Sequence, residues 1–149
     1  MNIRLRRPAS DDRIIRRLVL EELLPHSNLI WEESQVLKDI PVRLRKGVTY
    51  VAANRRNQPV GFALVQAKND ILLIDLLAVS SAAQGKGCGS ALLARAERYG
   101  RMQRCLLSRV YVDQGNDAAQ RFYERHGYRV KRYIAQIACH EMEKPLDRR

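Results

Sequence analysis

The sequence predicts an α/β fold in which helices flank one central sheet. Three strand-like segments follow one another directly between residues 48 and 79, as in an antiparallel meander. The last of them, residues 71–79, is apolar except for Asp75, which is typical of a central strand covered on both faces. Helical patterns lie before and after this run. We therefore expect residues 1–149 to form a single domain, as the length also favours.

The N-terminal part is expected to begin with a strand and a helix. Residues 3–6 alternate between apolar side chains and arginine, which predicts a short strand that ends before Pro8. Ser10 or Asp11 is the expected N-cap of a helix that continues to Pro25. The apolar stripe of this helix has helical period and consists of Ile14, Ile15, Leu18, Val19 and Leu23.

A second helix is predicted over residues 31–40, ending before Pro41 because proline breaks helices. In small-molecule enzymes such a region often shapes the acceptor pocket. The simpler interpretation is a solvated helix face with one packed Trp. The side chains that could contact an acceptor amine are Glu21, Glu22, His26, Trp31, Glu32 and Glu33.

The meander is expected to consist of strands over about residues 48–54, 59–68 and 71–79. A turn rich in Asn, Arg and Pro separates the first two strands, and the pair Asn69-Asp70 predicts a tight turn before the third. The expected downstream elements are a helix over residues 87–102, a strand over 105–112, a helix over 117–125 capped by Gly127, and closing strands over 128–133 and 138–144.

Three glycines at alternate positions, Gly85, Gly87 and Gly89, follow the apolar strand. Such glycines let the backbone approach a ligand closely, and the amides and dipole of the helix start behind them favour an anion. Lys86 adds a positive charge. We therefore predict a phosphate-bearing ligand held mainly by backbone amides, with a glycine-rich turn without ligand as the alternative. Neither the Walker pattern nor the dinucleotide fingerprint fits the spacing.

Two stretches resemble the GNAT superfamily of acetyl-CoA-dependent N-acetyltransferases. The first is the loop Gln84-Gly85-Lys86-Gly87-Cys88-Gly89, after a strand that ends Leu77-Ala78-Val79. The second is residues 116–128, which match the family pattern Asn, x, x, Ala, x, x, aromatic, Tyr, x, x, x, Gly, aromatic at each specified position. The resemblance covers most of the chain and implies a GNAT-like mixed, mostly antiparallel central sheet flanked by helices.

The resemblance also implies acetyl-CoA as cosubstrate. In that arrangement the strand over residues 71–79 splays from the strand over 105–112, and backbone groups near its end bind the acetyl group and the pantetheine arm. Asn116 hydrogen-bonds the same arm, and residues 84–90 bind the pyrophosphate. The implied cofactor contacts are Leu77, Ala78, Val79, Gln84, Gly85, Lys86, Gly87, Cys88, Gly89, Ser90, Asn116, Ala119 and Tyr123.

Tyr123 and Asp75 are the candidate catalytic residues. By resemblance, the Tyr123 hydroxyl lies near the sulfur of CoA and acts as general acid; without the family, a core aromatic beside Phe122 is the simpler interpretation. Asp75 is the candidate base, because a carboxylate in an apolar strand is costly to bury unless it is paired or used. A structural salt bridge to an arginine is the alternative. Period-two alternation places Asp75 on the face of Leu73 and Leu77.

Composition adds bounds on partners and location. The formal net charge is +11 and is spread along the chain, which suits a polyanionic ligand such as CoA; nucleic acid is an alternative partner that no motif supports. The three cysteines have no paired or metal-binding spacing, so we expect reduced thiols, no metal and a cytoplasmic protein without a membrane segment. His126 sits at a helix end, where a cation suits the dipole; His26 or His140 could orient an amine.

We therefore expect an enzyme that moves the acetyl group of acetyl-CoA to a primary amine by direct attack in a ternary complex. A small-molecule or sugar amine is the favoured acceptor. Ribosomal-protein N-terminal acetyltransferases carry near-identical loops, and a basic enzyme could acetylate charged tRNA, so these acceptors stay open. A non-catalytic acyl-CoA-binding or nucleic-acid-associated module is the alternative from another class. The chain could act as a monomer or a homodimer.

Overall fold

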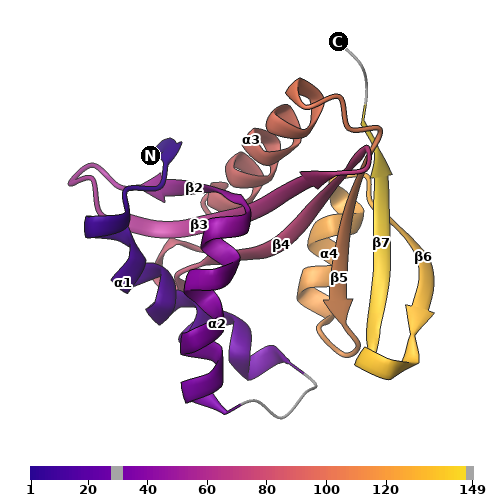
Figure 1. Ribbon diagram of the computed structural model, residues 1–149, viewed down its shortest axis with the longest axis horizontal. Coiled ribbons are helices and arrows are strands. Elements are labelled where there is room, and N and C mark those ends of the chain that lie inside the picture. The colour runs from indigo at the N-terminus through magenta and orange to yellow at the C-terminus, as the bar shows by residue number, and fades with distance from the viewer. Residues whose placement is uncertain (28–31, 147–149) are drawn as a thin grey trace.

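One seven-stranded sheet organises the protein (Figure 1). The computed structural model describes residues 1–27 and 32–146. The strand order is β1-β2-β3-β4-β5-β7-β6, in which β4 and β5 are parallel and the other neighbours antiparallel. The strands are β1 (Asn2–Leu5), β2 (Val48–Ala53), β3 (Pro59–Lys68), β4 (Ile71–Val79), β5 (Leu107–Asp113), β6 (Arg129–Ile134) and β7 (Cys139–Pro145), and the α-helices are α1 (Pro8–Leu18), α2 (Glu33–Lys46), α3 (Cys88–Met102) and α4 (Asp117–Arg125).

Helices cover both faces of this sheet, which confirms the mixed, mostly antiparallel α/β architecture expected from the sequence (Figure 1). α1 and α2 pack on one face, where Ile15 and Ile40 share an apolar cluster with Phe62 of β3. α3 packs on the opposite face through Leu92 and Leu93. α4 joins the same cluster as Leu93, so the helix pair α3 and α4 covers one side of the molecule.

The meander forms where the sequence predicts it. β3 and β4 coincide with the predicted ranges, and β2 ends one residue before its predicted end. Asn69 and Asp70 have φ angles of 53° and 64°, the left-handed conformation that a two-residue hairpin turn requires. Side chains on both faces of β3 are fully buried, as in Phe62 and Ala63, so the apolar character of this stretch reflects its central position.

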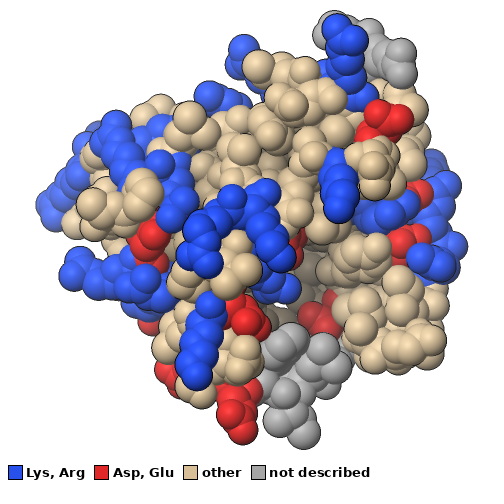
Figure 2. Space-filling model, in the orientation of Figure 1, with Lys and Arg blue, Asp and Glu red and all other residues tan. Residues whose placement is uncertain are grey.

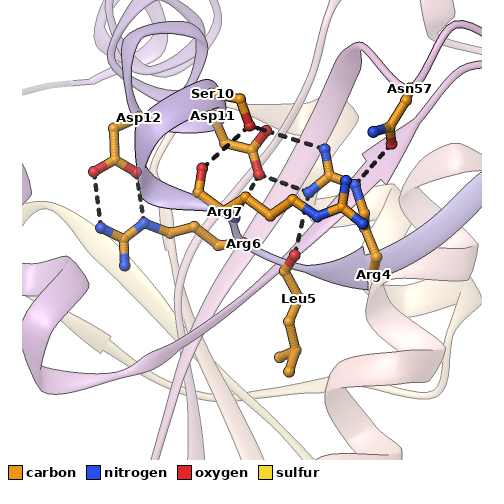
Figure 3. Close-up of polar contacts among 8 residues, drawn as sticks. All are labelled: Arg4, Leu5, Arg6, Arg7, Ser10, Asp11, Asp12 and Asn57. Atoms are coloured by element: carbon orange, nitrogen blue, oxygen red, sulfur yellow. Dashed lines mark hydrogen bonds and ion pairs between the residues drawn. The ribbon is translucent and has the colours of Figure 1, made fainter.

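α1 begins at Pro8, earlier than predicted, with Arg7 as its N-cap. Proline suits the first helical position because the N–H it lacks would be unpaired there. Ser10 and Asp11, the predicted N-caps, therefore lie inside the helix. The buried Asp11 carboxylate instead accepts hydrogen bonds from the Arg4 guanidinium at 2.7 and 3.0 Å and from the Arg7 N–H at 2.7 Å (Figure 3). It thus ties β1 to α1.

The segment after α1 is not one regular helix to Pro25, as the sequence predicted. A π-helical turn, η1 (Val19–Leu23), follows α1, and a 3-10 turn, η2 (Leu24–His26), follows η1. The Leu24 N–H donates to the Val19 carbonyl, the five-residue spacing of a π turn. π turns are frequent at functional sites, and this one lies at the cleft described below.

α2 continues through Pro41 to Lys46, so the prediction that it ends before Pro41 was wrong. Val36, Ile40 and Leu44 recur at helical spacing and are buried against the sheet. Burial of such side chains contributes roughly 1.5–3 kcal/mol each, which offsets the cost of one proline in a helix interior, about 3 kcal/mol. The packing of the last turn therefore outweighs the local effect of proline.

A β-bulge interrupts β4 at Asp75. Along β3, Val65 pairs with Ile74 and Leu64 pairs with Leu76, so Asp75 is the extra residue on its strand. A bulge bends a strand and re-aims the side chains that follow. The bulge lies directly after the last pair between β4 and β5, and it therefore contributes to the separation of these two strands.

Candidate active site

A cleft of about 730 Å³ opens where β4 and β5 separate. The two strands pair from Ile71 and Leu107 to Ile74 and Val110 and then diverge (Figure 1). The remainder of β4 keeps its pairing to β3, so its backbone groups on the β5 side are not used by the sheet. This is the splayed arrangement that the resemblance implies.

The glycine-rich loop and the start of α3 form one end of the cleft. Gly85 and Gly87 have φ angles of 77° and 81°, and a Cβ built at either would meet no atom within 4 Å. Gly87 is the N-cap of α3, and no side chain caps the helix. The first N–H groups of α3 are thus available to an anion, which the helix dipole also favours. The loop therefore combines open space with free backbone donors, as an anion such as a phosphate would need.

Gly89 serves a different purpose from the other two glycines. A Cβ at this position would lie 3.2 Å from a ring carbon of Phe122, in α4. The close approach lets α4 pack directly against the first turn of α3. The two sequence stretches that carry the family resemblance are therefore in contact.

Every predicted cofactor-binding or catalytic residue except Lys86 lines this single cleft. Lys86 is exposed on the loop and is not part of the lining. The residues brought together are Asp75, Leu77, Ala78, Val79, Gln84, Gly85, Gly87, Cys88, Gly89, Ser90, Asn116, Ala119 and Tyr123. Their roles remain predictions, but the fold brings the α4 end of the chain, with Asn116, Ala119 and Tyr123, to the continuous stretch from Asp75 to Ser90.

Side chains in the loop partly serve the protein itself. The Gln84 Nε2 donates to the Val79 carbonyl at 2.9 Å, which ties the end of β4 to the loop. The Cys88 side chain is 2% exposed and belongs to an apolar cluster with Leu92. Burial raises the pKa of the Cys88 thiol, so this group is poorly suited to act as a thiolate nucleophile.

α4 carries Tyr123, which lines the cleft, and hydrogen bonds fix both ends of this helix. At its start, Asn116 caps the helix by accepting from the Ala119 N–H at 3.3 Å. At its end, the Gly127 and Tyr128 N–H groups donate to the Glu124 and Tyr123 carbonyls, which is a Schellman motif with Gly127 in the predicted cap position. The rings of Tyr123 and Tyr128 then meet edge to face, 5.4 Å apart.

Tyr123 itself is 6% exposed. Burial raises the pKa of its phenol well above the usual range. The hydroxyl therefore stays protonated near neutrality and can act as a proton donor but not as a base.

Asp75 lies on the α2 side of the sheet, 3.7 Å from Arg43. The bulge has turned Leu77 to the α3 side, so the prediction that Asp75 and Leu77 share a face was wrong. Burial raises the pKa of the Asp75 carboxyl, and the positive charge of Arg43 opposes this only in part. The arrangement combines both interpretations of Asp75, a loose salt bridge and a carboxylate of increased basicity that lines the cleft.

Another end of the cleft is lined by residues of η1, η2 and α2. Glu22 and His26 line it as expected, but Glu21, Glu32 and Glu33 do not, and Trp31 lies outside the described residues. The Glu22 carboxylate accepts from the Ser81 N–H at 2.9 Å and from its hydroxyl at 2.8 Å. Glu22 therefore fixes the turn after β4.

Sequence reasoning missed several residues at this end, namely Leu23, Leu24, Val36, Asp39 and Arg43. The available signal was the spacing of Val36, Asp39 and Arg43, which puts them on one side of a helix. Ending the predicted helix before Pro41 removed Arg43 from that pattern.

Two features are absent from the described residues. Across residues 1–27 and 32–146, no helix is long and apolar enough to cross a membrane. Within the same ranges, no three His, Cys, Asp or Glu side chains gather in a way that could hold a metal ion.

Solved structures with this fold include several acetyltransferases. The PaiA N-acetyltransferase of Thermoplasma acidophilum, in complex with coenzyme A, has a TM-score of 0.77 and 20% identity over 97% of this chain and 99% of that one. The ribosomal-protein-alanine N-acetyltransferase of Brucella melitensis has a TM-score of 0.76 and 20% identity over 98% and 100%. A nourseothricin acetyltransferase is similar over 68% of this chain and 66% of that one, with a TM-score of 0.63 and 22% identity.

These identities are low, so the structural neighbours establish the fold alone. A comparison with curated protein sequences gives no match. The sequence does match the family model for the acetyltransferase (GNAT) domain, over residues 45–130. This match covers more than half of the chain and includes the glycine loop, Asp75 and all of α4. The protein belongs to the GNAT acetyltransferase family.

Proposed function

We propose that the protein transfers the acetyl group of acetyl-CoA to a primary amine by direct attack. One observation carries the proposal. The glycine loop, the open edge of β4, Asp75 and Tyr123 all line one cleft. The loop end offers backbone amides to phosphates, and the far end is open to an acceptor.

Asp75 and Tyr123 would divide the proton chemistry. Asp75 accepts a proton from the acceptor ammonium, directly or through water, so that the amine becomes neutral and can attack the thioester carbonyl. Backbone N–H groups of β4 on the β5 side stabilise the oxyanion. Tyr123 donates its phenolic proton to the departing thiolate sulfur and regains a proton from the attacking nitrogen, which loses it as the amide forms. The raised pKa values of both groups suit these roles, because the carboxylate becomes more basic and the phenol stays protonated.

We propose a small-molecule or sugar amine as the acceptor. Apolar side chains such as Leu23, Leu24 and Val36, together with the charged Asp39 and Arg43, line the acceptor end. This combination is typical of a pocket for a compact polar ligand. A protein N-terminus is the second candidate, since a ribosomal-protein-alanine N-acetyltransferase shares the fold over its whole length.

The basic surface keeps one further acceptor class open, an amine carried on charged tRNA. Lys and Arg side chains are spread over most of the face in Figure 2, and a hollow with acidic side chains at its rim opens on this face. The charge is diffuse and does not form a stripe. An enzyme that acts on tRNA would bind it with a steep dependence on salt concentration, whereas an enzyme for small amines would not.

Isothermal titration with acetyl-CoA and with CoA tests the proposal. We expect one-site binding of both without an acceptor, and acetyl transfer in a screen of small amines, sugar amines and peptide N-termini. Binding without turnover on any acceptor would favour the non-catalytic alternative. If neither ligand bound, the proposed function would be refuted, and the fold would have to serve another ligand.

A further inference from the structure

His126 links the two halves of the cofactor end of the cleft. This residue ends α4, and its Nδ1 lies 2.7 Å from the Phe122 carbonyl oxygen. Its Nε2 lies 2.9 Å from the Ser90 hydroxyl oxygen, in the first turn of α3. The Phe122 ring lies 4.5 Å from the imidazole and also contacts the position of Gly89. Both ring nitrogens are therefore used, and the ring orientation is fixed.

These partners determine where the imidazole proton lies. A carbonyl oxygen only accepts, so Nδ1 must carry a hydrogen and donate it to Phe122. In the neutral ring, Nε2 then has only a lone pair, and the Ser90 hydroxyl must donate to it. The hydroxyl hydrogen of Ser90 is thereby committed to His126. When the ring is neutral, the Ser90 oxygen has only lone pairs left and cannot donate a hydrogen bond to an anion at the start of α3.

A second proton on the ring reverses this polarity. Nε2–H then donates to the Ser90 oxygen, and the Ser90 hydroxyl hydrogen is released toward the cleft, which Ser90 lines. The proton comes from solvent, and no other bond changes. The resulting chain, imidazolium to hydroxyl to anion, consists of charge-assisted hydrogen bonds, which are stronger than neutral ones.

We propose that His126 is the positioning residue for the Ser90 hydroxyl, and that the pyrophosphate of CoA binds with a proton taken up by His126. The inference rests on the proposed function, because it assigns the phosphate end of the same cleft. It predicts that affinity for the cofactor falls as pH rises.

Among the described residues, few charged groups lie around this ring that could take up a proton in place of His126. Glu124 and Arg125 flank it on its own helix and are exposed. From β7, the Lys144 side chain runs beside Gly127, and its ammonium binds Glu97 of α3 at 2.9 Å. Ser90, the α3 side chain bonded to the ring, is uncharged.

The first test needs no ligand. Long-range ¹H–¹⁵N NMR of the histidines reports which ring nitrogen carries the proton, and His126→Gln assigns the His126 signals among the three histidines. We expect the Nδ1–H form of the neutral ring, which is the tautomer that its two partners require. Finding His126 in the Nε2–H form would overturn the inference whatever the enzyme binds.

The second test measures protons on binding. 3′-Dephospho-CoA is titrated calorimetrically in buffers of different ionisation enthalpy between about pH 6 and about pH 8. This probe keeps the pyrophosphate diester, which does not titrate there, and lacks the 3′-phosphate, which does. We expect proton uptake by the native protein, none by His126→Gln, and about tenfold weaker binding by that variant and by Ser90→Ala at the acidic end. His140→Gln is the control and should take up protons like the native chain.

The outcomes separate the two proposals. If the native protein bound neither CoA nor its 3′-dephospho form, the proposed function would fail. If it bound them with equal proton uptake in the native chain and in His126→Gln, the role of His126 would fail alone. His126→Phe keeps the aromatic contact with Phe122, so loss of affinity in this variant with an unchanged melting temperature assigns the effect to the ring nitrogens.

Discussion

Burial raises the pKa of both Tyr123 and Asp75, but the consequence differs for an acid and a base. The phenol is neutral at physiological pH in any case, and burial only secures its proton. The carboxylate is charged, so its burial makes the group more basic and destabilises the folded protein at the same time. At the residue scale, Asp75 is therefore where function and stability conflict.

Replacing Tyr123 with Phe removes the proposed proton donor and keeps the ring that contacts Tyr128. We expect turnover to fall about 100-fold, because general acid catalysis contributes at least that much, while the Kd for CoA changes less than threefold. Steady-state kinetic assays measure turnover, and calorimetric titration measures the Kd for CoA. Tyr133→Phe, an exposed position outside the cleft, is the control. Equal turnover in both variants would remove Tyr123 from catalysis.

Asp75→Asn is expected to lower turnover by about 100-fold and to abolish the acid limb of the pH–rate profile. In the native enzyme, activity should rise with pH through the raised pKa of Asp75 as the carboxylate forms. Asp70→Asn, in the exposed turn before β4, should leave the profile unchanged. A profile for Asp75→Asn that matches the native one would assign Asp75 to structure only.

The same substitution should raise the melting temperature by a few degrees at pH 7. A carboxyl whose folded pKa is raised binds more protons folded than unfolded, so its contribution to stability decreases as pH rises through that pKa. Asn avoids this cost. The difference from the native protein should shrink in acid, where Asp75 is protonated in both states. Calorimetric scans at several pH values measure this difference in melting temperature. If the ion pair with Arg43 outweighed the effect of burial, Asp75→Asn would instead lower the melting temperature at pH 7.

Gly87→Val tests the loop. Valine is strained at a φ of 81° and would fill the open space at Gly87, where we propose that the pyrophosphate binds. We expect the Kd for CoA to rise at least tenfold, with roughly 1–2 kcal/mol lost in stability. Ala82→Val adds similar bulk in the preceding turn, outside the cleft lining, and should bind normally. Unchanged affinity in Gly87→Val would show that the pyrophosphate does not lie on this loop.

At the scale of elements, local signals located most segments because local and tertiary preferences agree there. β3 and β4 are framed by turn residues and filled with apolar side chains, and α4 has both of its caps in the sequence. The bulge at Asp75 was not predictable, since register depends on the pairing partner. The residues at the proposed acceptor end of the cleft were predicted only in part. The last turn of α2 depends on packing, and η1 departs from regular helix geometry.

Pro41→Ala tests that explanation for α2. Alanine restores the backbone N–H and removes the clash with the preceding turn, so the free energy of unfolding should rise by roughly 1–3 kcal/mol. Urea denaturation measures the change. Val42→Ala, the exposed neighbour, leaves the backbone unaltered and should have little effect. A destabilised Pro41→Ala would mean that the proline shapes α2 in a way that the packing requires.

At the scale of the whole molecule, several acidic side chains, such as Asp11 and Glu141, are buried in hydrogen bonds and ion pairs with basic ones. Burial tends to raise the pKa of Asp11, but hydrogen bonds from Arg4 and the Arg7 amide outweigh this effect and lower it. In the same way, hydrogen bonds from Arg132 and Tyr111 outweigh the effect of burial on Glu141 and lower its pKa. Each group therefore adds stability above the usual carboxyl range and loses it as pH falls through its lowered pKa. The growing positive charge adds repulsion in acid.

We therefore expect the free energy of unfolding to fall steeply between roughly pH 4 and pH 2. Asp11→Asn should flatten this loss and reduce stability at pH 7 by about 3 kcal/mol, because it leaves Arg4 unpaired in a buried site. Asp12→Asn is the matched control, since the adjacent Asp12 binds Arg6 in the same manner but is 24% exposed (Figure 3). It should cost less than about 1 kcal/mol. Equal costs would contradict the importance of burial.

The edge strand β6 has a consequence for how copies of the chain meet. Among the strands that the structure describes it pairs with β7 alone, and Lys131 is an extra residue at a bulge in that pairing. Edge strands with free backbone groups invite another chain to add a strand, and bulges and cationic side chains prevent it. Arg129, Lys131 and Arg132 thus protect the exposed Val130 and Tyr133 from strand addition. Within the described residues the sheet therefore ends at an edge whose bulge and positive charge disfavour the addition of a strand from another copy.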